Sequence, residues 1–307
     1  MGVRNSGVEL TLSANPLEGA FRWGSRLNIS YNKNVIMNLP NGNRDLVLQG
    51  DRFDKSHVLS VGSPINAFYL YQTKGVFPTD ASVPQNPLTG EKYRNSNGTY
   101  MAGAFNLADL DGDYFIDIFN DGINPDKKVS GDPNPKYTGG WTNNFNYKNW
   151  SLGIFCTFTF DRDVLNLFES DRFANSQDGD PINSFANHST PDFSKINIWR
   201  PTNTNATYAK YDIGSYRYYY TSAQTFFLEK GGYFRIKSIN VGYDFPKNVL
   251  KTLGLSKFRI YGVADNVKMF QQSKRLPDAE AVNPYGEYSG AGYPIPSKYT
   301  LGFEINL

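Results

Sequence analysis

Apolar and polar residues alternate along several stretches of this chain, and this two-residue period is the strongest constraint on its fold. At the end of the chain, Tyr299, Leu301 and Phe303 fall on every second position, with Thr300 and Gly302 between them. Successive side chains of a strand point to opposite faces of a sheet, so the pattern predicts a strand with one apolar and one polar face. A sheet of such strands suits a boundary between two different solvents.

The same alternation recurs along the chain, and it predicts about ten strands at about 10 residues for each membrane crossing. The clearest segments are GVELTLS (7–13), FRWGSRLNISYN (21–32), WTNNFNY (141–147), WSLGIFCTFTFD (150–161), YFRIKSINVGYDFP (233–246) and the more mixed KFRIYGVADN (257–266). Lys148 and Asn149 predict a tight turn between two of them. The segment PKNVLKTLGL (246–255) predicts at most a short helix.

Long polar stretches separate these segments, which indicates short turns on one side of a sheet and long loops on the other. The polar stretches cover residues 33–63, 78–100, 162–224 and 267–296. Bulky aromatic residues are expected near strand ends, at membrane interfaces; they include Trp23, Tyr31, Trp141, Tyr147 and Trp150. The pattern favours an all-β, antiparallel transmembrane β-barrel with long extracellular loops. A soluble β-sandwich stays open, because its strands alternate in the same way.

Composition excludes several classes of protein. With 39% hydrophobic and 15% aromatic residues among 307, the chain is not a disordered tail. Lys and Arg number 31 against 29 Asp and Glu, without a basic block, so nucleic acid is not an expected partner. Cys156 is the single cysteine, which excludes an internal disulfide framework. No window of the sequence has the long apolar run of a membrane-spanning helix.

The segment DLDGDYFIDIFN (109–120) has some features of an EF-hand calcium loop. Its candidate ligands stand at loop positions 1, 3, 5 and 9; they are Asp109, Asp111, Asp113 and Asp117. Tyr114 stands where the sharp turn favours glycine, and Asn120 stands where a bidentate Glu belongs. Calcium is therefore a candidate cofactor, but we expect a solvated acidic turn that binds divalent metal weakly if at all.

Aromatic residues in the long loops are candidates for contact with a substrate or a partner. These residues are Trp199, in NIWRPTN, and Tyr216, Tyr218, Tyr219 and Tyr220, in YRYYYTSAQTFF. Aromatic rings can stack on sugars, but they can equally pack within a sheet or lie at a membrane interface.

Carboxylate pairs give little support for catalysis. Asp161 with Asp163, and Asp178 with Asp180, could be drawn as acid and base of a glycoside hydrolase. Spacing of two residues in a loop does not set the separation that such chemistry requires. We therefore expect a protein that is not an enzyme.

Six segments, in order, resemble the C-terminal half of the SusC/RagA family of TonB-dependent outer-membrane transporters. They are VRNSGVELTLSANP (3–16), HVLSVGSPINAFYLYQTKGVF (57–77), LADLDGDYFID (107–117), GDPNPKYTGGWTNNFNYKNWSLGIFCTFTF (131–160), NIWRPTNTNATY (197–208) and FFLEKGGYFRIKSINVGYDFP (226–246). The resemblance implies a plugged barrel in the outer membrane of Bacteroidetes-type bacteria. It also implies import of oligosaccharides or peptides, a SusD-like surface lipoprotein as partner, and coupling to TonB.

The resemblance covers a part of such a transporter. Residues 1–307 correspond to the C-terminal part of the barrel, and the N-terminal plug, the TonB-contacting segment and the first strands are expected outside this sequence. Relatives usually end on an aromatic residue, whereas this chain ends on Leu307. Two other functions stay open, a soluble carbohydrate-binding β-sandwich and a passive porin-like or adhesive barrel without TonB coupling.

Overall fold

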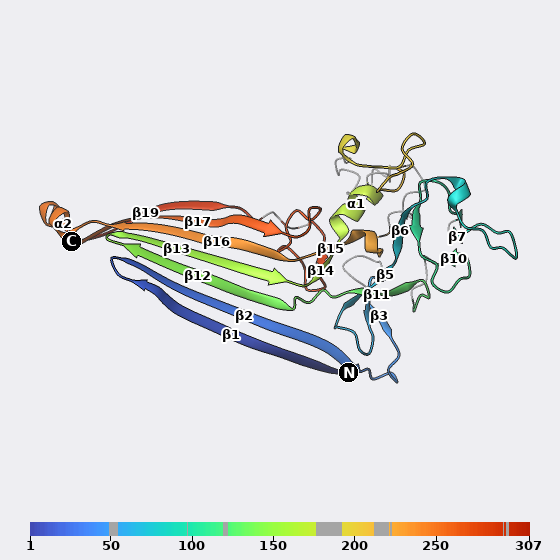
Figure 1. Cartoon of the computed structure of the whole chain (residues 1–307), viewed down its shortest axis with the longest axis horizontal. Coiled ribbons are helices and arrows are strands. Elements are labelled where there is room, and N and C mark those ends of the chain that lie inside the picture. Colours follow the sequence, from blue (N-terminus) through green and yellow to red (C-terminus); the bar gives the residue numbers. More distant parts are fainter. Residues whose placement is uncertain are drawn as a thin grey trace.

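The structure is a computed structural model that describes residues 1–48, 55–96, 98–118, 122–175, 192–211, 221, 223–290, 292 and 295–307. Its two parts are a long sheet and a compact layer of connecting segments at one end of that sheet (Figure 1). Among the described residues, no helix is long and apolar enough to cross a membrane.

Seven long strands form one antiparallel sheet, in which each strand pairs with the next long strand along the chain. In order across the sheet they are β1 (Gly2–Glu18), β2 (Phe21–Asn38), β12 (Tyr137–Tyr147), β13 (Trp150–Phe160), β16 (Tyr233–Asp244), β17 (Lys257–Gln271) and β19 (Lys298–Asn306). Every alternating segment named from the sequence lies in one of these strands. The all-β antiparallel prediction is therefore confirmed.

The expected number of about ten strands is larger than the seven in this sheet, counted over the described residues. The other strands are two to five residues long and belong to small separate sheets. One of them, β5 (Ala67–Tyr71), is buried along its whole length rather than on alternate positions. Continuous burial of this kind makes it a core strand of the connecting layer, not a strand of the long sheet.

Strand pairing sorts the side chains of the long sheet onto two faces. Leu152 pairs with Val241, Val241 with Gly262, and Gly262 with Leu301. Directly paired residues point to the same side, so this row lies on one face, here called the apolar face. By the same register the apolar face carries Leu27, Ile29, Ile154 and Phe303, and the opposite polar face carries Asn28, Thr157 and Gly302.

The apolar face is exposed in the part of the chain that the structure describes. Leu301 is 81% exposed, Phe303 72% and Val8 69%. In a β-sandwich a second sheet would cover such residues. The small sheets instead lie beyond one end of the long sheet (Figure 1), which does not support the sandwich alternative.

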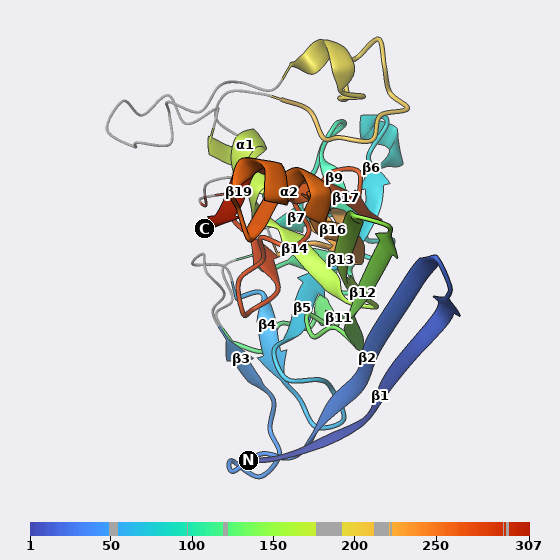
Figure 2. The same ribbon diagram turned by 90° about the vertical axis from the view of Figure 1, so that its left-hand side faces the viewer.

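Short and long connections lie at opposite ends of the long sheet, as the sequence predicts. Lys148 and Asn149 join β12 to β13, and Lys148 takes the positive φ of 52° that a tight hairpin turn requires. Helix α2 (Lys247–Leu253) joins β16 to β17 and ends at Gly254, whose φ is 67°. These turns and the C-terminus lie at one end, and residues 39–136, 161–232 and 272–297 connect strands at the other (Figure 1). Seen from the turn end, α2 and the C-terminus lie in front (Figure 2).

The described residues of these three connections fold into what we call the loop layer. Its sheets contain β3 (Leu46–Leu48), β4 (His57–Leu59), β5 and β11 (Lys127–Gly131); β6 (Thr73–Val76) and β9 (Phe105–Leu107); β7 (Arg94–Asn95), β8 (Gly98–Thr99) and β10 (Phe115–Ile116); and β14 (Asp163–Asn166), β15 (Leu228–Lys230) and β18 (Glu287–Tyr288). Helix α1 (Leu167–Asn175) and 3-10 turns at Asp80–Ser82, Phe193–Lys195 and Thr225–Phe227 complete it.

The loop layer has its own hydrophobic core, which the polar composition of the connections did not predict. The core is built largely from aromatic and aliphatic side chains that are at most 2% exposed; they include Phe68, Leu70, Tyr71, Phe77, Phe105, Leu107, Leu165, Leu167 and Phe227. Members come from the first and the second connection. Burial of these side chains supplies the free energy that orders segments otherwise rich in Asn, Gly and Pro.

Polar contacts tie the connections together around this core. Arg275 forms ion pairs with Glu169 at 2.5 Å and with Glu229 at 2.9 Å, which joins the third connection to the second. The amide of Thr73 donates to the hydroxyl of Thr225 at 2.9 Å, which joins the first connection to the second. The loop layer is therefore one interlocked body rather than three independent loops.

Gly302 is a sterically closed position on the polar face. Gly302 lies on that face, where an Arg would seem tolerable, but a Cβ at Gly302 would lie 2.4 Å from the ring of Tyr261. The tyrosine ring occupies the space above the glycine, so Gly302 accepts no larger side chain without movement of Tyr261.

Leu27 and Asn28 are neighbours on β2 that face opposite sides of the sheet, and they form a matched pair for a test of facing. We expect Leu27→Arg to destabilise the membrane-inserted protein by about 2 to 4 kcal/mol, because it places a charge in hydrocarbon. Asn28→Arg should cost far less. Reversible unfolding in lipid vesicles measures both, and equal penalties on the two faces would count against a membrane barrel.

Candidate functional site

The apolar face of three adjacent strands begins and ends on an aromatic residue. The pairs are Phe21 and Tyr31 on β2, Tyr147 and Tyr137 on β12, and Trp150 and Phe160 on β13, each ten residues apart. Ten residues at about 3.3 Å each, tilted by about 40°, span roughly 25 Å along a membrane normal. Roughly 25 Å is also the height of the apolar band of outer-membrane barrels.

Two polar side chains on the apolar face of β2 and β12 each accept a hydrogen bond from a tryptophan. The indole N–H of Trp23 donates to Asn143 Oδ1 at 3.0 Å, and that of Trp141 donates to Ser25 Oγ at 2.9 Å. Asn143 is only 6% exposed. Trp141 lies in the middle of its strand, so the expectation that it marks a strand end is wrong, and its indole serves a polar group inside the apolar face.

Near the turns the polar face carries paired charges, Lys257 with Glu304 and Arg259 with Asp244, together with uncharged polar side chains. The uncharged side chains include Asn28, Asn144, Ser151, Asn240 and Thr300, with glycines between them. Toward the loop layer, Arg235 is buried on this face and pairs with Asp278 at 2.7 Å and with Glu280 at 2.6 Å. Both carboxylates belong to the third connection, so these ion pairs fasten part of the loop layer over the polar face.

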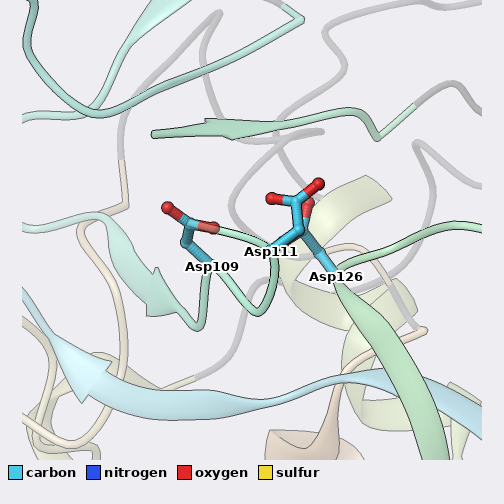
Figure 3. A group of neighbouring side chains, drawn as sticks. All are labelled: Asp109, Asp111 and Asp126. Atoms are coloured by element: carbon cyan, nitrogen blue, oxygen red, sulfur yellow. The ribbon is translucent and has the colours of Figure 1, made fainter. Parts of the chain in front are cut away.

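The acidic loop brings three carboxylates together, and one of them was not predicted. Carboxylate oxygens of Asp109, Asp111 and Asp126 lie within 4.8 Å of one another (Figure 3). Asp126 follows the motif by many residues, and no spacing rule links it to the motif. Three oxygen ligands fit a hard cation such as Ca²⁺ in kind, although calcium usually takes 6 to 8.

Hydrogen bonds within the loop already use several of these oxygens. Asp109 accepts from the amides of Gly112 at 2.6 Å and Tyr114 at 2.9 Å, and Asp126 accepts from the amide of Leu110 at 2.9 Å. Tyr114 has a φ of 66°, so a tyrosine takes the left-handed position for which the sequence pattern favours glycine.

The other predicted ligands face elsewhere. Asp113 accepts from the amide of Phe115 at 2.7 Å, and Asp117 accepts from the hydroxyl of Ser96 at 2.9 Å. Neither belongs to the three-carboxylate cluster found among the described residues. Asn120 lies outside the described residues. The loop is therefore stabilised as an acidic turn by its own amides, and only Asp109 and Asp111 of the predicted ligands meet.

Asp126 is the carboxylate whose ionisation the structure disfavours most clearly. It is 1% exposed, and burial raises its pKa to about 6 against the hydrogen bond from Leu110, which lowers it. Repulsion by the nearby carboxylates of Asp111, Asp109 and Asp113 contributes to this raised pKa. A bound cation would reverse this effect, because it favours the ionised form.

Trp199 is a half-buried residue with a fixed orientation. Its indole N–H donates to the carbonyl of Pro78 at 3.1 Å, and its ring fills the space beside Gly103, whose φ of 86° and missing Cβ permit the approach. Whether Trp199 contacts a substrate or a partner stays a prediction. Tyr216, Tyr218, Tyr219 and Tyr220 lie outside the described residues.

Asp161 and Asp163, considered above as an acid–base pair, each form an ion pair with a different lysine. Asp161 forms an ion pair with Lys136 at 2.7 Å, and Asp163 forms one with Lys230 at 2.7 Å. Asp178 and Asp180 lie outside the described residues. This pairing gives Asp161 and Asp163 structural partners and leaves no support for a shared acid–base role.

A buried polar junction joins the first connection to the third. His57 and Glu287 are each 1% exposed, with His57 Nδ1 3.7 Å from a carboxylate oxygen of Glu287. The hydroxyl of Ser56 lies 3.0 Å from His57 Nδ1, and His57 Nε2 lies 2.9 Å from the carbonyl of Tyr285. The Nε2–H tautomer fits this arrangement, since a carbonyl only accepts. Burial lowers the pKa of His57, although Glu287 and the Tyr285 carbonyl act in the opposite direction.

Comparison with known proteins shows what this chain is similar to. No protein-family model matches it. TonB-dependent receptor P3 of Formosa agariphila is 28% identical over 320 residues, and TonB-dependent receptor P26 of the same organism is 25% identical over 324 residues. Each alignment covers 99% of this chain. This chain is related to the TonB-dependent receptors.

Solved structures agree with this relationship at the level of the fold. A chain of the RagAB peptide transporter superposes with a TM-score of 0.72 at 18% identity, over 99% of this chain. The SusC/RagA resemblance is thereby confirmed, and outer-membrane proteins are the class to which this chain belongs. The chain spans 29% of the length of both P3 and that RagAB chain.

Asp126→Asn tests whether the acidic loop holds a cation. A carboxyl whose folded pKa is raised contributes stability that is fully present below about pH 3.8 and is lost as the pH rises through about 6. Without a bound cation, the substitution should therefore slow hydrogen exchange at Leu110 and Gly112 at neutral pH. Asp113→Asn, outside the cluster, is the control. Calcium-dependent protection that Asp111→Asn and Asp126→Asn both abolish would show a metal site and contradict the expected acidic turn.

Acidification tests the His57 junction. A histidine whose folded pKa is lowered contributes stability that is fully present above its ordinary pKa of 6.5 and is lost as the pH falls through the lower value. We expect hydrogen exchange at residues 57–59 and 283–287, corrected for the intrinsic pH dependence, to accelerate between about pH 7.5 and about pH 5. His57→Gln should remove that dependence. An unchanged pH profile in the variant would assign the effect to another group.

Proposed function

We propose that this chain forms part of the barrel wall and the loop layer of an outer-membrane importer that depends on TonB. Its role is passage of a nutrient through the barrel, not chemistry on that nutrient. Import by the complete protein is the function that the relationship and the geometry together support best.

The observation that carries this proposal is the pair of aromatic ends on the apolar face. In three neighbouring strands the apolar face has the length of the apolar band of an outer-membrane barrel, and aromatic residues stand at both limits. A soluble carbohydrate-binding domain has no reason to expose leucines such as Leu10, Leu12 and Leu301 on the same face.

The polar face supports the choice of an importer of polar nutrients. Amide and hydroxyl groups on this face can exchange hydrogen bonds with water, with sugar hydroxyls or with peptide groups. We therefore retain oligosaccharides and peptides as the two substrate classes. The RagAB relative is a peptide transporter, which favours peptides by analogy alone.

The remaining parts of the importer belong to the rest of a longer protein and to its partners. We propose that further strands close the barrel, that a plug fills it and contacts TonB, and that a SusD-like lipoprotein binds the outer side of the loop layer. The loop layer is a suitable base for such a partner, because it is a folded body with its own core. A passive porin-like barrel would need none of these parts.

Uptake by living cells tests the proposal. Cells that carry the complete gene should accumulate labelled glycans or peptides only when TonB and a proton gradient are present. Cells that carry only residues 1–307 should not, because the edges of an open sheet expose unpaired backbone groups to hydrocarbon. Uptake that persists without TonB would favour the passive barrel, and energised uptake by residues 1–307 alone would contradict the need for further strands.

A further inference from the structure

Two cations lie on the apolar face just beyond its aromatic limit at the loop-layer end. On β1 and β2, Ser6 pairs with Lys33 and Arg4 pairs with Val35. Val8 pairs with Tyr31 in the same register, so Arg4 and Lys33 point to the same side as Tyr31. We call these two residues the cationic pair.

If the apolar face spans the outer membrane, as proposed above, Lys33 lies at the height of lipid headgroups and the backbone of Arg4 lies just beyond them. Lys33 is two residues beyond Tyr31, which is about 5 Å along the membrane normal, and Arg4 is four residues beyond Val8, or about 10 Å. The polar headgroup region is roughly 5 to 8 Å thick on each side of the hydrocarbon core. Both side chains are long enough to reach this region.

The loop layer covers the opposite side of the same strand segment but leaves the cationic pair exposed. Asn34 accepts from the amide of Ile65 at 2.7 Å, and Ile36 is fully buried. Arg4 and Lys33, in contrast, are both exposed. The surface that carries them therefore faces the surroundings of the barrel rather than its interior.

No carboxylate among the described residues neutralises the cationic pair. The ion pairs of this part of the chain include Lys136 with Asp161 at 2.7 Å, but none that involves Arg4 or Lys33. Arg4 and Lys33 are diagonal neighbours on paired strands, so a single anion from outside can contact both. A guanidinium beside an ammonium matches a phosphate group, to which Arg binds through two N–H groups and Lys through its charge.

We propose that Arg4 and Lys33 bind the phosphate group of a lipid headgroup in the outer leaflet. Tyr31, whose ring packs 5.1 Å from that of Tyr137, lies directly below and fits the boundary between headgroup and acyl chains. The cationic pair thus holds a phosphorylated lipid against the barrel wall at the edge of the loop layer. This proposal adds a lipid site to the proposed importer and does not depend on which nutrient it imports.

The test uses the complete protein extracted from outer membranes, wild type and Arg4→Ala with Lys33→Ala. Each is placed in nanodiscs that contain lipid A with its phosphates or the same lipid without them, and bound lipid is counted by native mass spectrometry. Wild type should retain the phosphorylated lipid in preference, and each lost cation should weaken retention by roughly five-fold. The matched control, Lys92→Ala with Lys128→Ala, removes two exposed lysines of the loop layer and should behave as wild type.

Other outcomes contradict the proposal. Equal retention of both lipids, or equal losses in the two double variants, would show that the cationic pair recognises no phosphate on a lipid. Displacement of the lipid by millimolar inorganic phosphate would assign the site to a free anion. If the double alanine variant fails to assemble, the single variant Lys33→Gln must still retain about five-fold less phosphorylated lipid. The charge-preserving variant Arg4→Lys with Lys33→Arg must retain as much of it as wild type. A protein absent from the membrane would instead contradict the proposed function itself.

Discussion

Hydrocarbon accepts no unpaired polar group, and the long sheet is arranged around that constraint. Strand pairing satisfies the backbone between neighbouring strands, and the two-residue period then decides which side chains face lipid. At Asn143 and Ser25, two polar side chains of the apolar face, an indole N–H donates to the polar group. The outer edges of β1 and β19 are the places where this arrangement needs further strands.

The loop layer meets a different solvent and is built in a different way. Water can satisfy its exposed backbone, so its strands are short and irregular, and its stability comes from an aromatic core and from ion pairs such as Arg275 with Glu169. The same chain therefore contains a wall that depends on local periodicity and a layer that depends on contacts between distant segments.

This difference explains how much of the structure could be predicted from the sequence. The long strands and the turn at Lys148 were predictable, because alternation and turn chemistry are local properties of neighbouring residues. The core around Phe68 and the junction of His57 with Glu287 were not, since they join residues whose positions in the chain carry no shared pattern. Asp126 escaped prediction for the same reason, whereas Asp109 and Asp111 stood in a recognisable motif.

The interlocking of the three connections also limits how such a protein can diverge. A longer or shorter first connection would have to preserve both the hydrogen bond of Thr73 to Thr225 and the packing of His57 against Glu287. Substitutions, insertions and deletions are better tolerated at turns that make no contact with another connection. The turn around Leu88, a side chain 93% exposed, is such a place, and its backbone is held by local hydrogen bonds to Asn86 and Thr89 rather than by another connection. Sequence and length variation among relatives should therefore concentrate in exposed turns of this kind. Residues that join the three connections should instead change together.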